Sequence, residues 1–167
     1  MNHENCMAIA GYPAHVMSFI HNRLGTPGAR SVGYNHHKEI LDVLERDGMV
    51  RLKHHDSGAC TMRRTVLGST AKMIATRMFD AEPLTDKGRL WVNQFGHHEF
   101  IARFPADSEE LMDGLGEAVE KGLYLRGEDR HYRTFMGRHL WHQLTGNPRP
   151  DAAKAIPEFD YAELALF

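Results

Sequence analysis

Residues 40–68 hold the pattern that most constrains what this chain can fold into. Apolar residues first recur at helical spacing, and Asp47-Gly48 predicts where that helix ends. From residue 49 to residue 53 apolar and basic residues alternate, which is typical of a half-buried strand. Asp56-Ser57-Gly58 predicts a turn, and residues 60–66 predict a returning basic strand. The stretch therefore predicts a helix followed directly by a hairpin with a cationic face.

The rest of the first half predicts further short helices. We expect a helix over residues 5–24 that breaks or kinks at Pro13, and a short turn or helix over residues 29–35. Asn35 is the expected N-cap of the helix that ends at Asp47-Gly48. Two later helices are expected, one over residues 70–79 capped by Ser69 and one beyond Pro83 capped by Thr85.

The second half repeats the plan of the first. A helix from Ser108 to Gly122 leads into an expected strand over residues 123–126, a turn, a strand over 131–135 and a helix over 137–144. The segments Arg64-Thr-Val-Leu-Gly68 and Arg133-Thr-Phe-Met-Gly137 follow the two expected hairpins. Two interpretations stay open: a true internal repeat, or the chance recurrence of a common arrangement.

Composition places the chain among globular proteins. Hydrophobic residues make up 42% and charged residues 25% of its 167 residues. No apolar run is long enough for a membrane helix, and from the first residues we expect no secretory signal. Cys6 and Cys60 are the two cysteines, too few and too far apart for a disulfide framework. We expect a cytoplasmic protein with reduced thiols.

Charge is unevenly distributed although the net charge is only −2. Residues 49–79 carry six Lys and Arg against the single acid Asp56, whereas residues 80–121 carry ten acids against four bases. A basic block beside an acidic block predicts one surface that faces a polyanion and another that faces away from it. The alternative is that the two blocks neutralise each other in the fold.

Two segments carry a resemblance to a known family. Ile40-Leu-Asp-Val-Leu-Glu-Arg-Asp-Gly-Met-Val-Arg51 is similar to the end of a recognition helix and the first strand of a wing. Pro83-Leu-Thr-Asp-Lys-Gly-Arg-Leu-Trp91 is similar to the entry into the following helix. Residues 12–95 thus resemble the winged helix-turn-helix domain of MarR-like and PadR-like regulators. The segment from 53 to 84 is longer than that family needs, which predicts an inserted helix or a different hairpin.

The resemblance implies that this protein binds double-stranded DNA. In such domains the N-terminal end of the recognition helix meets base edges, while the wing meets phosphates or the minor groove. Carried over to this chain, the helix end consists of Tyr34, Asn35, His36, His37 and Lys38. The wing residues are Arg51, Lys53, Arg63 and Arg64. Glu39, Asp42 and Glu45 lie on the same helix and must face away from the DNA backbone.

Other chemistries find little support in the sequence. Twelve histidines invite a metal hypothesis, but adjacent pairs such as His36-His37 rarely chelate one ion because neighbouring side chains diverge. Walker, G-x-S-x-G, H-E-x-x-H and dinucleotide-binding motifs are missing from the chain. A reactive thiol at Cys60, which lies among bases, and a buried one are both considered. We expect neither a metal, nor a cofactor, nor an enzyme.

The overall prediction is a mainly α protein with short β-hairpins, of the α+β class, holding one or two tandem winged-helix units. The expected domains are residues 1–95, a smaller unit over residues 96–147 and a C-terminal tail over residues 148–167. We expect a homodimeric transcriptional regulator. The alternative is a phage-type inhibitor or a protein-docking module, which uses the acidic block to bind a nucleic-acid machine.

Overall fold

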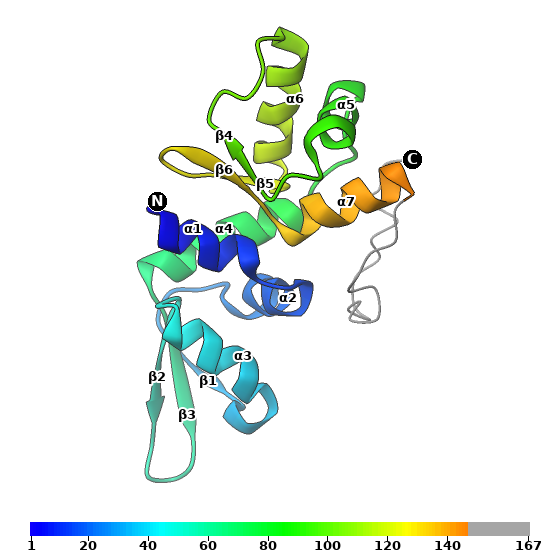
Figure 1. The fold of residues 1–167 in the computed structure, drawn as a ribbon. Helices are drawn as coiled ribbons and strands as arrows, with labels where there is room; N and C mark the ends of the chain where they lie inside the picture. The colour runs from blue at the N-terminus through cyan, green and yellow to red at the C-terminus, as the bar shows by residue number, and fades with distance from the viewer. Residues whose placement is uncertain (147–167) are drawn as a thin grey trace.

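The protein is a mixture of helices and two small antiparallel sheets, in agreement with the expected α+β class (Figure 1). The computed structural model describes residues 1–146, so the predicted linker and C-terminal tail at 147–167 lie outside the described residues. Buried apolar side chains from both halves of the chain form one continuous core.

The chain opens with two helices that meet at a sharp bend. Helix α1 (His3–Gly11) ends before Tyr12, and α2 (Ala14–Arg23) begins after Pro13, which serves as its N-cap. The predicted break at Pro13 is confirmed, because a proline ring fits the first turn of a helix but not its interior. The two helices then separate: α2 packs on α4 (Val66–Phe79), whereas α1 packs on strands of the second half.

The first sheet forms around the predicted hairpin. Strands β2 (Val50–His54) and β3 (Cys60–Arg64) pair antiparallel, and β1 (Ala29–Val32) pairs with the other side of β3. The prediction of a turn or helix over residues 29–35 was therefore wrong. β1 escaped the sequence analysis because its four residues carry almost no apolar alternation, so its pairing with β3 outweighs its local pattern.

Two helix starts also differ from the prediction. Helix α3 (Tyr34–Arg46) begins directly after β1, so its N-cap is Gly33 rather than Asn35, and it is kinked at His37 (φ −126°, ψ 20°). Helix α4 begins four residues earlier than expected, because the hydroxyl of Thr65 accepts a hydrogen bond from the Gly68 amide. Ser69 is thus inside the helix. α4 is the helix that we expected over residues 70–79.

The second half repeats this order of elements. Its members are α5 (Asp86–Phe95), β4 (Phe100–Ala102), α6 (Glu109–Glu120), β5 (Tyr124–Arg126), β6 (Arg130–Arg133) and α7 (Phe135–Thr145). The sheet order is β4-β6-β5, which matches β1-β3-β2 in the first half. We call the set α2–α4 the first repeat and the set α5–α7 the second repeat. Because α5 packs on α6 and α7, we begin the second repeat at Asp86, while the expected domain boundary after residue 95 stays a prediction.

The two repeats share hydrogen bonds at matching positions. In the first, the Thr65 hydroxyl donates to the carbonyl oxygens of Gly48 and Met49 at 2.5 and 3.0 Å. In the second, the Thr134 hydroxyl donates to the carbonyl oxygens of Gly122 and Leu123 at 2.6 and 3.1 Å. This agreement in detail favours a true repeat over chance recurrence.

A glycine in the first turn of the last helix lets that helix touch the hairpin in each repeat. A Cβ atom on Gly68 would lie 2.0 Å from the Met49 carbonyl oxygen, and one on Gly137 would lie 2.3 Å from that of Leu123. Both distances are far below any normal contact, so only glycine allows the approach.

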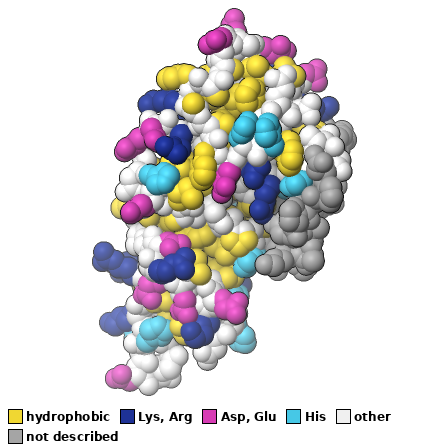
Figure 2. All heavy atoms as spheres, viewed as in Figure 1, with side chains coloured by type: hydrophobic (Ala, Val, Ile, Leu, Met, Phe, Trp, Pro, Cys, Tyr) yellow, Lys and Arg dark blue, Asp and Glu magenta, His cyan; other side chains and the backbone are white. Residues whose placement is uncertain are grey.

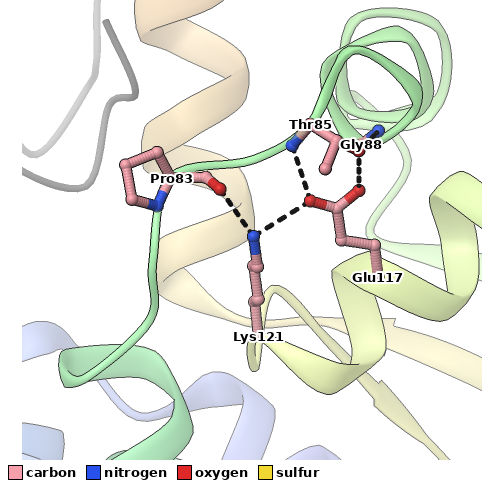
Figure 3. A network of polar contacts seen from close by, with 5 residues as sticks. All are labelled: Pro83, Thr85, Gly88, Glu117 and Lys121. Atoms are coloured by element: carbon pink, nitrogen blue, oxygen red, sulfur yellow. Dashed lines mark hydrogen bonds and ion pairs between the residues drawn. The ribbon is translucent and has the colours of Figure 1, made fainter.

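A polar network closes the second repeat at the junction with α4. The carboxylate of Glu117 on α6 accepts hydrogen bonds from the amide and hydroxyl of Thr85, and pairs with Lys121 at 3.0 Å (Figure 3). Lys121 also donates to the Pro83 carbonyl (Figure 3). Burial would raise the pKa of Glu117, but these hydrogen bonds outweigh burial and hold the pKa below its ordinary value. Thr85 caps α5 as predicted.

Candidate nucleic-acid interface

The first sheet has one face toward the core and one toward solvent. Val50, Cys60 and Met62 are buried on the inner face. The opposite face, here called the outer face, alternates with them and consists of Ala29, Ser31, Arg51, Lys53, Thr61 and Arg63. Alternation of side chains along a strand produces this separation, as the sequence pattern of residues 49–53 predicted.

Two arginines face each other on the outer face. Arg51 on β2 and Arg63 on β3 are directly opposed in the register, and both are exposed. Directly opposed like charges destabilise a sheet. The outer face carries no acid, and among the described residues neither arginine nor Lys53 takes part in an ion pair. The face is therefore a concentrated positive surface without an internal counter-charge.

Arg64, the fourth predicted wing residue, lies on the other face. Its guanidinium donates to the carbonyl oxygen of Leu24 at 2.7 Å, at the C-terminal end of α2. Lys72 on α4 donates to the His21 carbonyl of the same helix. Both cations thus satisfy carbonyl groups that a helix end leaves without partners. Arg64 has a structural position here, and its counterpart Arg133 binds the Gly96 carbonyl at 2.7 Å.

Helix α3 lies beside the hairpin, along the edge strand β2. The carboxylate of Glu45 accepts a hydrogen bond from the Leu52 amide at 3.1 Å, at the middle of the strand. At the last residue of the strand, the rings of Tyr34 and His54 meet edge to face, with their centres 4.7 Å apart. The start of α3 is therefore placed next to the far end of the hairpin, as Figure 1 also shows.

The predicted residues at the start of α3 have different surroundings. Asn35, His36 and Lys38 are exposed. Lys38 pairs with Asp42 at 2.7 Å, and these contacts raise the pKa of Lys38 and lower that of Asp42. His37 turns inward at the kink, with its ring 5.1 Å from that of Phe19. The Tyr34 hydroxyl also donates to Asp42 at 2.7 Å, so the Asp42 carboxylate is bound by two side chains of its own helix.

The second sheet has no such cationic face. The positions that match Arg51 and Arg63 are Leu125 and Tyr132, which are opposed in the same register and are 7% and 1% exposed. Helix α1 packs on the strands β5 and β6, and its His3 contacts the Tyr132 hydroxyl at 2.5 Å. The positions of this opposed pair are thus apolar and buried in the second repeat, but cationic and exposed in the first.

The charge difference extends over both repeats. From Ala14 to Phe79 there are ten Lys and Arg against five acids, whereas from Asp86 to Thr145 there are eight against ten. Acidic side chains gather at the upper end of the molecule in Figure 2, where α6 begins with Glu109 and Glu110. Lys and Arg reach the left edge of the lower part, which holds α3 and the first sheet.

Metal and thiol chemistry have no assembled site in the described part of the chain. No three His, Cys, Asp or Glu side chains among residues 1–146 come together as metal ligands would. Both cysteines are free and buried. Burial raises the pKa of the Cys60 thiol, so its basic neighbours in sequence do not activate it.

Comparison with known proteins adds no relative to this picture. The chain matches no protein-family model, and no curated protein or solved structure is significantly similar to it. Within residues 1–146 no helix has both the length and the apolar character to cross a bilayer.

Proposed function

We propose that this protein binds double-stranded DNA through the outer face of the first sheet and the exposed start of α3, and acts as a transcriptional regulator. The observation that carries the proposal is the opposed pair Arg51 and Arg63, which is open to solvent and has no counter-charge. A polyanion supplies that charge, and the phosphate backbone of DNA has the spacing and density to do so.

The order of elements supports a winged-helix interpretation of each repeat. A helix, a strand, a second helix and a two-stranded hairpin follow one another, and the sheet joins the lone strand to the hairpin. In the winged helix-turn-helix family that this chain resembles, the second helix enters the major groove while the hairpin forms a wing. α3 and the β2–β3 hairpin take these roles here. The second repeat acts as a support, because α1 covers its sheet.

Contacts divide between phosphates and bases. Arg51, Lys53 and Arg63 bind phosphates, which gives affinity and register but little sequence selectivity. Asn35 is exposed at the start of α3 and pairs with adenine through its amide. The acids of α3 are already engaged in part, since Glu45 binds a strand amide and Asp42 binds Lys38.

A salt series with matched variants tests the proposal. The double variant Arg51→Ala, Arg63→Ala is compared with Arg77→Ala, Arg126→Ala, which removes two exposed arginines outside the outer face. Binding to a random duplex is measured by fluorescence anisotropy. We expect the outer-face variant to lower the slope of log K against log salt by about 1.8, or about 0.9 for each lost phosphate contact. The control variant keeps the wild-type slope.

Two outcomes would contradict the proposal. The first is a wild-type protein that binds no duplex DNA even at low salt. The second is an equal loss of affinity in both double variants, which would assign binding to total charge and not to the outer face.

Absence of DNA binding would favour the second candidate, a protein-docking module. Glu109 and Glu110 lie in the exposed first turn of α6, and no ion pair involving either is found among the described residues. This acidic end would bind a basic partner protein, as a phage-type inhibitor of a nucleic-acid machine does.

A homodimer that presents two outer faces to a two-fold operator stays part of the first proposal, with sedimentation velocity as its test.

A further inference from the structure

A pocket opens in the first repeat where the second repeat is closed. It has a volume of about 590 Å³ and lies between the end of α2, strand β1 and the start of α3. Its polar walls come from Asn22, Arg23, Arg30 and His37, and Val32 and Met62 add an apolar part. Figure 1 shows the chain passing from α2 down to β1 and then into α3. The volume is in the range of small-molecule sites, roughly 300–1,000 Å³.

The helix contact that closes the second repeat depends on two glycines that the first repeat lacks. In the second repeat α5 and α6 pack closely at Gly88 and Gly114, where a Cβ atom would already overlap the facing helix. Counting from the shared hydrogen bonds at the helix ends, the matching residues of the first repeat are Val16 and Ile40. The first repeat therefore carries larger side chains at both positions where glycine allows the close helix contact of the second repeat.

The residues that line the pocket replace core residues of the second repeat. Arg30 occupies the register position of Ile101, which is 7% exposed and part of the core. Arg23 matches Phe95, which stacks on Trp91 with ring centres 4.3 Å apart. His37 matches Leu111, which packs against the core. Two cations and an imidazole thus stand where the same fold elsewhere has apolar side chains.

The two arginines have no acidic partner. Within residues 1–146, neither Arg23 nor Arg30 forms an ion pair, and no carboxylate lines the pocket. Paired arginine side chains favour carboxylate and phosphate groups, which accept two parallel hydrogen bonds from one guanidinium.

From these observations we infer that the pocket binds a small organic anion, a molecule with a phosphate or carboxylate group on Arg23 and Arg30 and an apolar part against Val32 and Met62. The site is separate from the outer face, because Arg30 and Met62 are paired on the opposite face of the sheet from Arg51 and Arg63.

Calorimetry on the full chain tests the site, with phenyl phosphate as the probe. Phenyl phosphate is expected to bind saturably, inorganic phosphate to bind more weakly, and phenol not to bind. The variant Arg30→Ile carries the residue of the second repeat, so it should fold normally and lose at least about tenfold in affinity, as for one charged hydrogen bond. Arg77→Ala, which removes an exposed arginine elsewhere, should bind like the wild type.

Binding that is not saturable, or that is unchanged in Arg30→Ile, would overturn the inference. A DNA titration separates the remaining alternative, that these arginines bind backbone phosphates. Arg30→Ile should keep the wild-type salt slope for duplex DNA, and a slope lowered as in the outer-face variant would overturn the small-molecule site. Because the calorimetry contains no DNA, its result stands independently of the proposed function.

Discussion

Replacement of Gly68 by alanine should be one of the most damaging single changes in this protein. The new Cβ atom would lie 2.0 Å from the backbone oxygen of Met49, whereas an ordinary carbon–oxygen contact is roughly 3.3 Å. The start of α4 would therefore have to move away from β2 by more than about 1 Å. Backbone atoms cannot turn aside as a flexible side chain can, so the strain cannot be relieved locally.

The magnitude follows from three terms. Overpacking costs about 1–3 kcal/mol. The displacement also breaks the hydrogen bonds from the Thr65 amide and hydroxyl to the Met49 oxygen, each worth about 1 kcal/mol. Alanine is more favourable than glycine inside a helix by about 1 kcal/mol, which offsets part of this cost. Gly68→Ala should thus lower the free energy of unfolding by about 2–4 kcal/mol.

Urea unfolding followed by circular dichroism measures this loss. Gly137→Ala should have a similar effect, because its Cβ would lie 2.3 Å from the Leu123 oxygen. Gly116→Ala is the matched control: it is also inside a helix, but its Cβ would meet nothing within 4 Å, so it should gain about 0.5–1 kcal/mol. If Gly68→Ala were as stable as the wild type, the close approach of helix and hairpin would not be a feature of the repeat.

Two further predictions concern buried charges. Glu117→Gln should lower the free energy of unfolding at neutral pH by about 1.5–3 kcal/mol, since it weakens hydrogen bonds to a charged group. Because the folded-state pKa of Glu117 lies below the unfolded value of about 4.3, its stabilisation is present above that pH and is lost as the pH falls through the folded pKa. Urea titrations should therefore show the difference between variant and wild type shrinking below pH ~4, and a constant difference would refute this pKa. Arg64→Ala should lower stability by about 1–2 kcal/mol but leave the DNA salt slope unchanged, and a reduced slope would place Arg64 among the phosphate contacts.

Sequence reasoning worked best where local patterns decide the structure. Alternation predicted the half-buried strand β2, and the Asp47-Gly48 pair correctly marked the end of α3. The cap at Thr85 and the start of α6 at Ser108 were also predicted, because a hydroxyl before an amphipathic run has a clear local role.

The misses share one physical cause, which is dependence on distant partners. β1 and β4 each have four residues or fewer and are strands only because β3 and β6 pair with them. Arg64 follows Arg63 directly and carries the same charge, yet its strand position turns it inward to α2. No sequence pattern marked Arg23 and Arg30 as pocket residues. Only comparison of the two repeats in the structure shows that they replace apolar side chains.

The position of α1 has a consequence for how the protein is made. α1 is synthesised before the other described helices, yet it packs on β5 and β6, and the contact between His3 and Tyr132 spans 129 positions of sequence. α1 must therefore wait, without its final partner, until nearly all of residues 1–146 have been synthesised. Closure of so long a loop is slow and comes late, so we expect α1 to dock last and to leave an apolar surface available to chaperones until then.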